Sequence, residues 1–169
     1  MIEDSRIESF NKQIYILRGA IINNLILLER TIDEYLSVFF TKNKELCGPL
    51  RDWVFAECIN LDNKIKILSS VLENYENEFL SHHSSLIANL QYLKDKRNVF
   101  AHYLILNDEE SVELFLRELT VTFVKFRTDS YLIFYKKDEL ERIERLMASC
   151  TPILVELVEK GRAKPSQLQ

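Results

Sequence analysis

Residues 5–41, SRIESFNKQIYILRGAIINNLILLERTIDEYLSVFFT, carry apolar side chains at steps of three and four positions. This spacing places them on one face of an α-helix, which has 3.6 residues per turn. The members of this apolar stripe are Ile14, Leu17, Ile21, Leu25, Leu28, Ile32, Tyr35, Leu36 and Phe39. The stretch therefore predicts one long helix whose apolar face packs against other elements.

The next part of the chain shows the same helical pattern of apolar residues. Few breakers interrupt it, because the 169 residues include only 3 glycines and 3 prolines. The segment Asn43–Pro49 is expected to break the chain. A second helical region is predicted over 50–78, divided near Asn60–Asn63, and a third helix over 84–102.

The sequence pattern changes after residue 102. The stretch 111–119 fits either a strand or a short amphipathic helix. Residues typical of strands occur over 121–127 and 131–135. The sequence Thr128-Asp129-Ser130 between them is typical of a turn, so a β-hairpin is predicted here.

A last helix is expected after the hairpin. The run Asp138-Glu139-Leu140-Glu141 has capping-box spacing, with Asp in place of Ser or Thr at the helix start. Pro152 is expected to kink this helix, and Gly161 to end it. Its inward residues are predicted to be Leu140, Ile143, Met147, Leu154 and Leu157.

These elements predict a mainly α protein. We expect an up-and-down helical bundle of four to five helices, with a β-hairpin inserted before the last helix. A chain of 169 residues is long enough for one domain with a sizeable core but short for two. Residues 1–169 are therefore predicted to form a single helical domain, with 161–169 as a loose tail.

Composition argues against several kinds of site. The net charge of -4 argues against nucleic-acid binding by the overall charge of the protein, so any contact with nucleic acid would be local. The three cysteines lie far apart, and His82 and His83 have no acidic or cysteine partner at ligand spacing. The glycines are isolated and form no phosphate-binding loop. We therefore expect neither a metal nor a cofactor.

The location of the protein is inferred from two features. The N-terminus is acidic and lacks the basic start of a signal peptide. The most apolar stretch, Ala20–Leu28, is interrupted by Asn23 and Asn24 and is too short to span a bilayer. A cytoplasmic protein without membrane contact is expected.

The third helix carries the sharpest functional signal. On a helical wheel, Leu90, Leu93 and Phe100 fall within about 60° of Arg97, so this arginine lies in the apolar stripe. Asn98 and His102 are four positions apart and share one side of the helix. An unpaired guanidinium is costly to bury, so Arg97 requires a partner.

The first predicted helix carries acidic residues, opposite in charge to Arg97, within or beside its own apolar stripe. Glu29 lies within its apolar stripe, Asp33 lies near the edge of the stripe, and Arg18 is a further charge inside it. Two helices that each bury a charge suggest either a shared polar pocket or a structural ion pair. In the structural interpretation, Arg97 ties its helix to a carboxylate and His102 caps the helix end.

The motif Lys96-Arg97-Asn98-Val99-Phe100-Ala101-His102 resembles the defining Arg-polar-x-x-x-His motif of the HEPN superfamily. The resemblance covers about residues 10–160, and its specific part is this motif. It implies a helical bundle that dimerises and brings two motif copies together, often as a ribonuclease of toxin–antitoxin, phage-defence or RNA-processing systems. One subgroup has Tyr two places after the His; here that position is Leu104, and Tyr103 lies one place early.

By position, the resemblance implies that Arg97, Asn98 and His102 form the active-site set and that Glu29 is a supporting acid. Lys94 and Lys96, which cluster before His102, are the candidate substrate-binding residues. The implied partners are RNA, a second copy with the site at the dimer interface, and an antitoxin or operon partner protein.

These side chains suit RNA cleavage without a metal. RNA carries its own nucleophile, the 2′-hydroxyl. His102 can exchange protons near neutral pH, Arg97 can bind phosphate oxygens through its planar fork, and Asn98 can donate a hydrogen bond. The expected function is a metal-independent endoribonuclease that gives 2′,3′-cyclic phosphate products. The alternative is a non-catalytic HEPN-type module for dimerisation or for nucleotide or partner binding.

Overall fold

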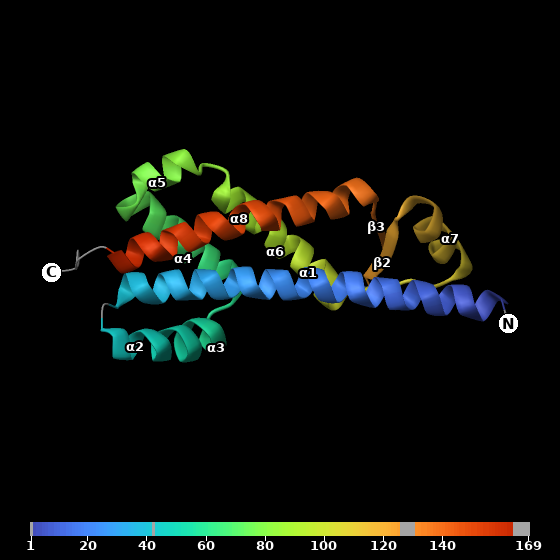
Figure 1. Ribbon diagram of the computed structural model, residues 1–169, viewed down its shortest axis with the longest axis horizontal. Helices are drawn as coiled ribbons and strands as arrows, with labels where there is room; N and C mark the ends of the chain where they lie inside the picture. The colour runs from blue at the N-terminus through green and yellow to red at the C-terminus, as the bar shows by residue number, and fades with distance from the viewer. Residues whose placement is uncertain (1, 42, 126–130, 164–169) are drawn as a thin grey trace. The chain divides into compact units, whose positions relative to one another are not determined.

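The computed structural model describes residues 2–41, 43–125 and 131–163 of the chain, and it is mainly helical (Figure 1). The prediction of a mainly α fold with a hairpin before the last helix is confirmed, although the helical segments are more numerous than the four to five expected. The elements are α1 (Ile2–Phe40), α2 (Lys44–Pro49), the π-helical segment η1 (Leu50–Phe55), α3 (Ala56–Cys58), α4 (Leu61–Tyr75), α5 (Asn77–His82), α6 (Leu86–His102), β1 (Leu104–Ile105), α7 (Glu109–Glu118), β2 (Val121–Lys125), β3 (Tyr131–Tyr135) and α8 (Lys137–Ala163).

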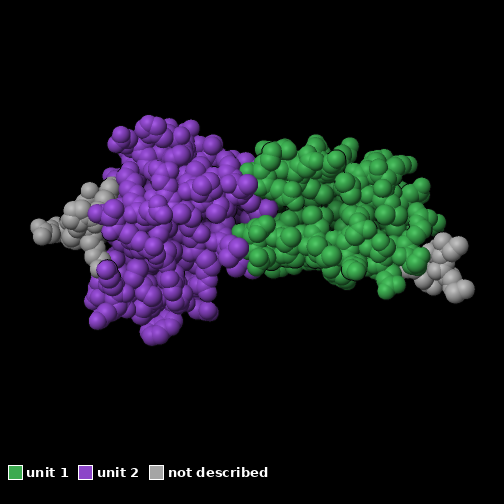
Figure 2. All heavy atoms as spheres, viewed as in Figure 1, with its two compact units in different colours: residues 1–24, 95–145 green, residues 25–94, 146–169 purple. Residues whose placement is uncertain are grey.

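The chain divides into two compact units (Figure 2). Unit 1 comprises residues 1–24 and 95–145, and unit 2 comprises residues 25–94 and 146–169. All three boundaries between these segments fall inside helices, so α1, α6 and α8 each contribute to both units. The single domain expected over residues 1–169 stays a prediction.

Unit 1 contains an antiparallel sheet with the strand order β1-β2-β3. The predicted hairpin is present as β2 and β3, with Phe123 opposite Ile133; its expected turn at 128–130 lies outside the described residues. The rings of Phe100, Phe123 and Tyr135 meet edge to face, with centroids 4.9–5.4 Å apart. This aromatic cluster packs the end of α6 against the sheet. The short strand β1 was not predicted.

The stretch that fitted either a strand or a helix is the helix α7. The side chain of Asp108 accepts a hydrogen bond from the backbone N–H of Ser111 at 2.8 Å, which satisfies one of the free donors at the helix start. Val112 and Phe115 are buried, so the helix is amphipathic. Leu119 ends α7 in the left-handed conformation, with φ of 52°.

In unit 2, the expected break at Asn43–Pro49 is wrong, because most of this segment is helix α2. The side chain of Asn43 accepts a hydrogen bond from the N–H of Glu45 and starts the helix. Pro49 has no N–H to donate, and the chain continues after it with the wider π-helical hydrogen bonding of η1. The division predicted near Asn60 is confirmed, since its side chain caps α4.

The last helix begins and ends differently from the prediction. The backbone N–H groups of Glu139 and Leu140 donate to the carbonyl of Lys136, so Asp138 lies inside the first turn and does not cap it. Gly161 does not end α8, which continues to Ala163. A Cβ at Gly161 would lie 3.2 Å from Cγ1 of Val38, so the glycine allows close approach to α1. The loose tail expected from residue 161 is therefore wrong at its start; residues 164–169 lie outside the described part.

Unit 2 has an apolar core. Its described hydrophobic side chains that are 0% exposed are Ile32, Leu36, Leu68, Leu72, Cys150, Leu154 and Leu157. The expected inward face of the last helix is confirmed at Leu154 and Leu157. None of the described helices combines the length and the apolarity needed to cross a bilayer.

The central strand of the sheet buries a hydroxyl that lacks a hydrogen-bond partner among the described residues. Thr122 is 3% exposed, and its Oγ1 is unpaired. We expect Thr122→Val to raise the free energy of unfolding by about 1 kcal/mol, because the variant removes the buried hydroxyl and keeps the shape. Urea unfolding measures this. Thr31→Val is the control, since the hydroxyl of Thr31 donates to the carbonyl of Leu27 at 3.0 Å, and it should not stabilise the protein.

Candidate functional site

The three motif residues lie on the last turns of α6, in unit 1. The apolar stripe predicted for this helix is confirmed, because Leu86, Leu90, Leu93 and Phe100 are each 1% exposed. Arg97 is half-buried, whereas Asn98 and His102 are exposed. The helix therefore presents a polar edge beside its buried face.

His102 is the last residue of α6. Its exposed imidazole makes no hydrogen bond or ion pair with any described residue, which leaves both ring nitrogens available to a ligand. The role of binding a terminal carbonyl is filled by Arg18, whose guanidinium donates to the carbonyl of Ala101 at 3.1 Å. A cation at this position also complements the negative end of the helix dipole.

The two lysines predicted to bind substrate are both paired with carboxylates. Nζ of Lys94 lies 2.8 Å from Oδ1 of Asp62, in unit 2. Nζ of Lys96 lies 2.6 Å from Oε1 of Glu139, in unit 1, and 4.8 Å from the centroid of the Tyr135 ring. Each ammonium would have to give up such a contact, or share it, in order to hold a phosphate.

A further cation, in unit 1, belongs to the strand β2. Nζ of Lys125, on β2, lies 5.1 Å from the ring centroid of Tyr103 and 5.5 Å from that of Tyr131. Both distances are within the range of cation–π attraction. Tyr103 directly follows His102, so this cluster adjoins the motif. Lys125 was not predicted as a site residue, and the signal that was missed is the pair of tyrosines that the fold places beside it.

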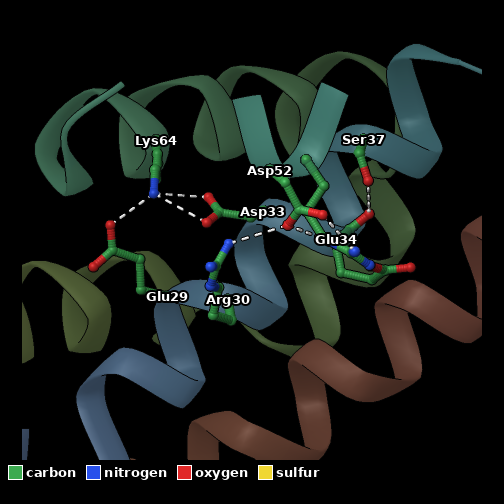
Figure 3. Close-up of polar contacts among 8 residues, drawn as sticks. Glu29, Arg30, Asp33, Glu34, Ser37, Asp52 and Lys64 are labelled. Atoms are coloured by element: carbon green, nitrogen blue, oxygen red, sulfur yellow. Dashed lines mark hydrogen bonds and ion pairs between the residues drawn. The ribbon is translucent and has the colours of Figure 1, made fainter. Parts of the chain in front are cut away.

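Glu29, the predicted supporting acid, belongs to unit 2 and lies in a buried charge cluster (Figure 3). Nζ of Lys64 lies 2.7 Å from Oε1 of Glu29 and 2.8 Å and 3.1 Å from the two oxygens of Asp33. Lys64 and Asp33 are each 1% exposed, and Glu29 is 18% exposed. The cluster therefore holds one ammonium and two carboxylates almost out of water.

Lys64 is the member of this cluster that sequence reasoning missed. Its spacing in the sequence could have revealed its burial. It lies three residues after Leu61 and four before Leu68, and this spacing places it in the apolar stripe of α4. Burial raises the pKa of Asp33, although the hydrogen bond and the charge of Lys64 oppose this. The cluster costs desolvation energy and is held by charge pairing, which is typical of a structural ion pair.

A neighbouring network surrounds Glu34, one residue further along α1. Its two carboxylate oxygens lie 2.7 Å from Nη1 of Arg51 and 2.7 Å from Nη2 of Arg162. Burial opposes the ionisation of Glu34, but the hydrogen bonds from these arginines outweigh it and hold its pKa below the usual value. Arg51 also pairs with Asp52, which accepts from Arg30 (Figure 3). These contacts tie α1 to η1 and to the end of α8.

Within the described ranges, no group of three or more His, Cys, Asp or Glu side chains is placed to hold a metal ion. Comparison of the chain with family models, with curated proteins and with solved structures found no match. Fold and site together define a mainly helical protein with a small antiparallel sheet and an exposed Asn98–His102 edge at the end of α6.

The raised pKa of Asp33 predicts a pH dependence of stability. Because the folded state binds this proton more tightly than the unfolded chain, the free energy of unfolding falls as the pH rises from about 4 through the folded pKa. Asp33→Asn removes this titration. The stability of the variant relative to the wild type should therefore increase with pH over this range, as measured by urea unfolding at several pH values.

Asp62 provides a control, because its pKa is shifted in the opposite direction to that of Asp33. Hydrogen bonds from Lys66 and Lys94 lower its pKa to about 2. The contribution of ionised Asp62 to the free energy of unfolding is therefore present above the ordinary pKa and is lost as the pH falls toward 2. Relative to the wild type, Asp62→Asn should lose stability as the pH rises through 2–4. A flat difference for Asp33→Asn would show that Asp33 titrates alike in both states.

Proposed function

We propose that this protein is a metal-independent endoribonuclease with Arg97, Asn98 and His102 as its active-site set. One observation carries the proposal: the imidazole of His102 is exposed, without a partner among the described residues, on the same side of α6 as the exposed amide of Asn98. A proton-transfer group must reach its substrate, and an accessible imidazole at a helix end meets that requirement.

The reaction follows from the chemistry of RNA. His102 removes the proton of the 2′-hydroxyl, whose oxygen attacks the adjacent phosphorus. Arg97 and Asn98 hold the phosphate oxygens as negative charge builds up. The bond to the 5′-oxygen breaks, and that oxygen takes a proton from a second imidazole. The products are a 2′,3′-cyclic phosphate and a 5′-hydroxyl.

The second imidazole is His102 of another copy in a homodimer. A two-fold axis near the ends of the two α6 helices would bring two motif sets to one strand, one acting as base and the other as acid. We propose that such a nuclease serves as a toxin or phage-defence component in the cytoplasm, restrained by an antitoxin or operon partner protein.

Substrate contact is assigned to the Tyr103–Lys125–Tyr131 cluster in addition to Lys94 and Lys96, which pair with Asp62 and Glu139. In this cluster an ammonium lies over two aromatic rings. Aromatic rings stack on unpaired bases without regard to sequence, and a neighbouring ammonium attracts the backbone phosphates. The favoured substrate is therefore single-stranded RNA.

The test uses the purified full-length chain and a 5′-labelled single-stranded RNA of mixed sequence, with EDTA present throughout. We expect cleavage to fragments that end in a 2′,3′-cyclic phosphate. The same oligonucleotide with a single 2′-deoxy residue at a mapped cleavage site should resist cleavage there. RNA left intact with EDTA and with Mg²⁺ would refute the nuclease.

The alternative is a non-catalytic HEPN-type module that dimerises or binds a nucleotide or partner protein. It is favoured by the pairing of Lys64 with Glu29, which gives the predicted supporting acid a structural role. The module would bind single-stranded RNA or a nucleotide in a gel-shift or calorimetric experiment and leave it uncleaved.

A further inference from the structure

Strand β3 forms one edge of the sheet in unit 1. The backbone N–H of Leu106 donates to the carbonyl of Thr122 at 3.0 Å, so the backbone groups of Thr122 point toward β1. In an antiparallel sheet, successive residues direct these groups to opposite sides. Phe123 therefore points toward β3, where it pairs with Ile133. By the same alternation, the N–H and C=O groups of Leu132 and Phe134 point away from the sheet.

These outward groups have no partner among the described residues. The sheet ends at β3, and no described residue bonds to the backbone of Leu132 or Phe134 on that side. The side chains of the same two residues are 50% and 53% exposed. They share one face of the sheet with Leu104, which is 52% exposed.

Natural proteins protect such edges with charges, prolines or bulges, because an open apolar edge pairs readily with another strand. The strand Tyr131–Tyr135 contains neither a charged residue nor a proline. The edge thus combines unused hydrogen-bonding groups with apolar side chains. This is the chemistry that binds an extended peptide by strand addition.

Charge indicates the kind of strand. Lys136 and Lys137 directly follow β3 and are exposed. Lys136 makes no ion pair with a described residue, and Lys137 lies only at 3.8 Å from Glu141. Asp138 comes next, so residues 136–138 carry two positive charges and one negative charge. The two residues that directly follow the β3 edge are therefore both positively charged.

We propose that the β3 edge docks an extended, acidic segment of a partner protein, which adds as an antiparallel fourth strand. In antiparallel pairing, the N-terminal end of the partner segment lies beside Lys136 and Lys137. The acidic residues of the segment are therefore expected at its N-terminal end. Apolar residues at alternate positions of the segment would meet Leu132 and Phe134. The docking edge is independent of the proposed nuclease activity.

The experiment measures binding of two fluorescent heptapeptides, DEVTVTV and KKVTVTV, acetylated and amidated, to the full-length chain. We expect the acidic peptide to bind at least about tenfold more tightly at low salt, and the preference to shrink at high salt. On binding, hydrogen exchange of the Leu132 and Phe134 amides should slow. No binding of either peptide at millimolar concentration overturns the proposal.

Two variants separate the edge from its charges. Phe134→Pro removes an outward N–H that the pairing with β2 does not use, so folding should persist while binding weakens roughly fivefold to tenfold. The double variant Lys136→Glu with Lys137→Glu leaves the strand untouched and should reverse the peptide preference. Unchanged binding in both variants refutes docking at this edge. A dimer in sedimentation analysis that Phe134→Pro dissociates would overturn the proposal in favour of a second copy.

Discussion

Replacing Lys64 by methionine is expected to lower the free energy of unfolding by about 3–5 kcal/mol. The variant keeps the length and the apolar stem of the side chain but removes the ammonium that pairs with Asp33, whose side chain is 1% exposed. The carboxylate of Asp33 would then lie buried without this ammonium and near the negative charge of Glu29. The loss is larger than that of a surface ion pair because the Asp33 carboxylate cannot be fully hydrated in the folded state.

Urea unfolding at pH 7 measures this loss. Lys66→Met is the matched control, since Lys66 lies on the same helix, pairs with Asp62 and is 65% exposed; its loss should stay below about 1 kcal/mol. Adding Glu29→Gln and Asp33→Asn to Lys64→Met should restore much of the stability, because no uncompensated charge remains. Equal effects at Lys64 and Lys66 would contradict the burial of the cluster.

Replacing His102 by alanine is expected to reduce RNA cleavage by about 10²–10⁴-fold, the usual contribution of a positioned acid or base. The side chain is exposed and makes no hydrogen bond with a described residue, so the free energy of unfolding should change by no more than about 0.5 kcal/mol. Initial rates on the labelled single-stranded RNA, alongside circular dichroism, measure both quantities.

His82→Ala is the matched control for this experiment. His82 is also exposed at the end of a helix, but its Nδ1 lies 2.8 Å from the carbonyl of Glu78 in α5, a helix of unit 2 that carries none of the motif residues. Cleavage should be unchanged in this variant. If His102→Ala cleaves RNA at the same rate as the wild type and His82→Ala, His102 has no part in proton transfer, and the proposed active-site set is wrong.

Much of the helical framework could be predicted from periodicity. The stripe through Ile14, Ile21 and Ile32 specifies a helix because each of these side chains is buried on one face, and α1 follows it closely. Local breakers were less informative. Pro49 does not interrupt the helical region, since the π-helical turn η1 accommodates its missing donor, and that accommodation depends on packing rather than on residue type.

For the charged residues too, some properties could be predicted from the sequence and others could not. Glu29 and Arg97 could be recognised as charges within apolar stripes, because a wheel reveals which face a residue occupies. The wheel does not reveal the partner. Lys64 lies 35 positions from Glu29 along the chain, and only the folding of α4 brings its ammonium within 2.7 Å.

By itself, the sequence determined the helical class, the hairpin and the polar edge of the motif helix, because these depend on residues a few positions apart. The tertiary structure alone decided which charges pair, the placement of Lys125 between two tyrosines, and the open edge of β3. Each of these depends on segments that are distant along the chain, and their approach is governed by packing and desolvation of the whole unit.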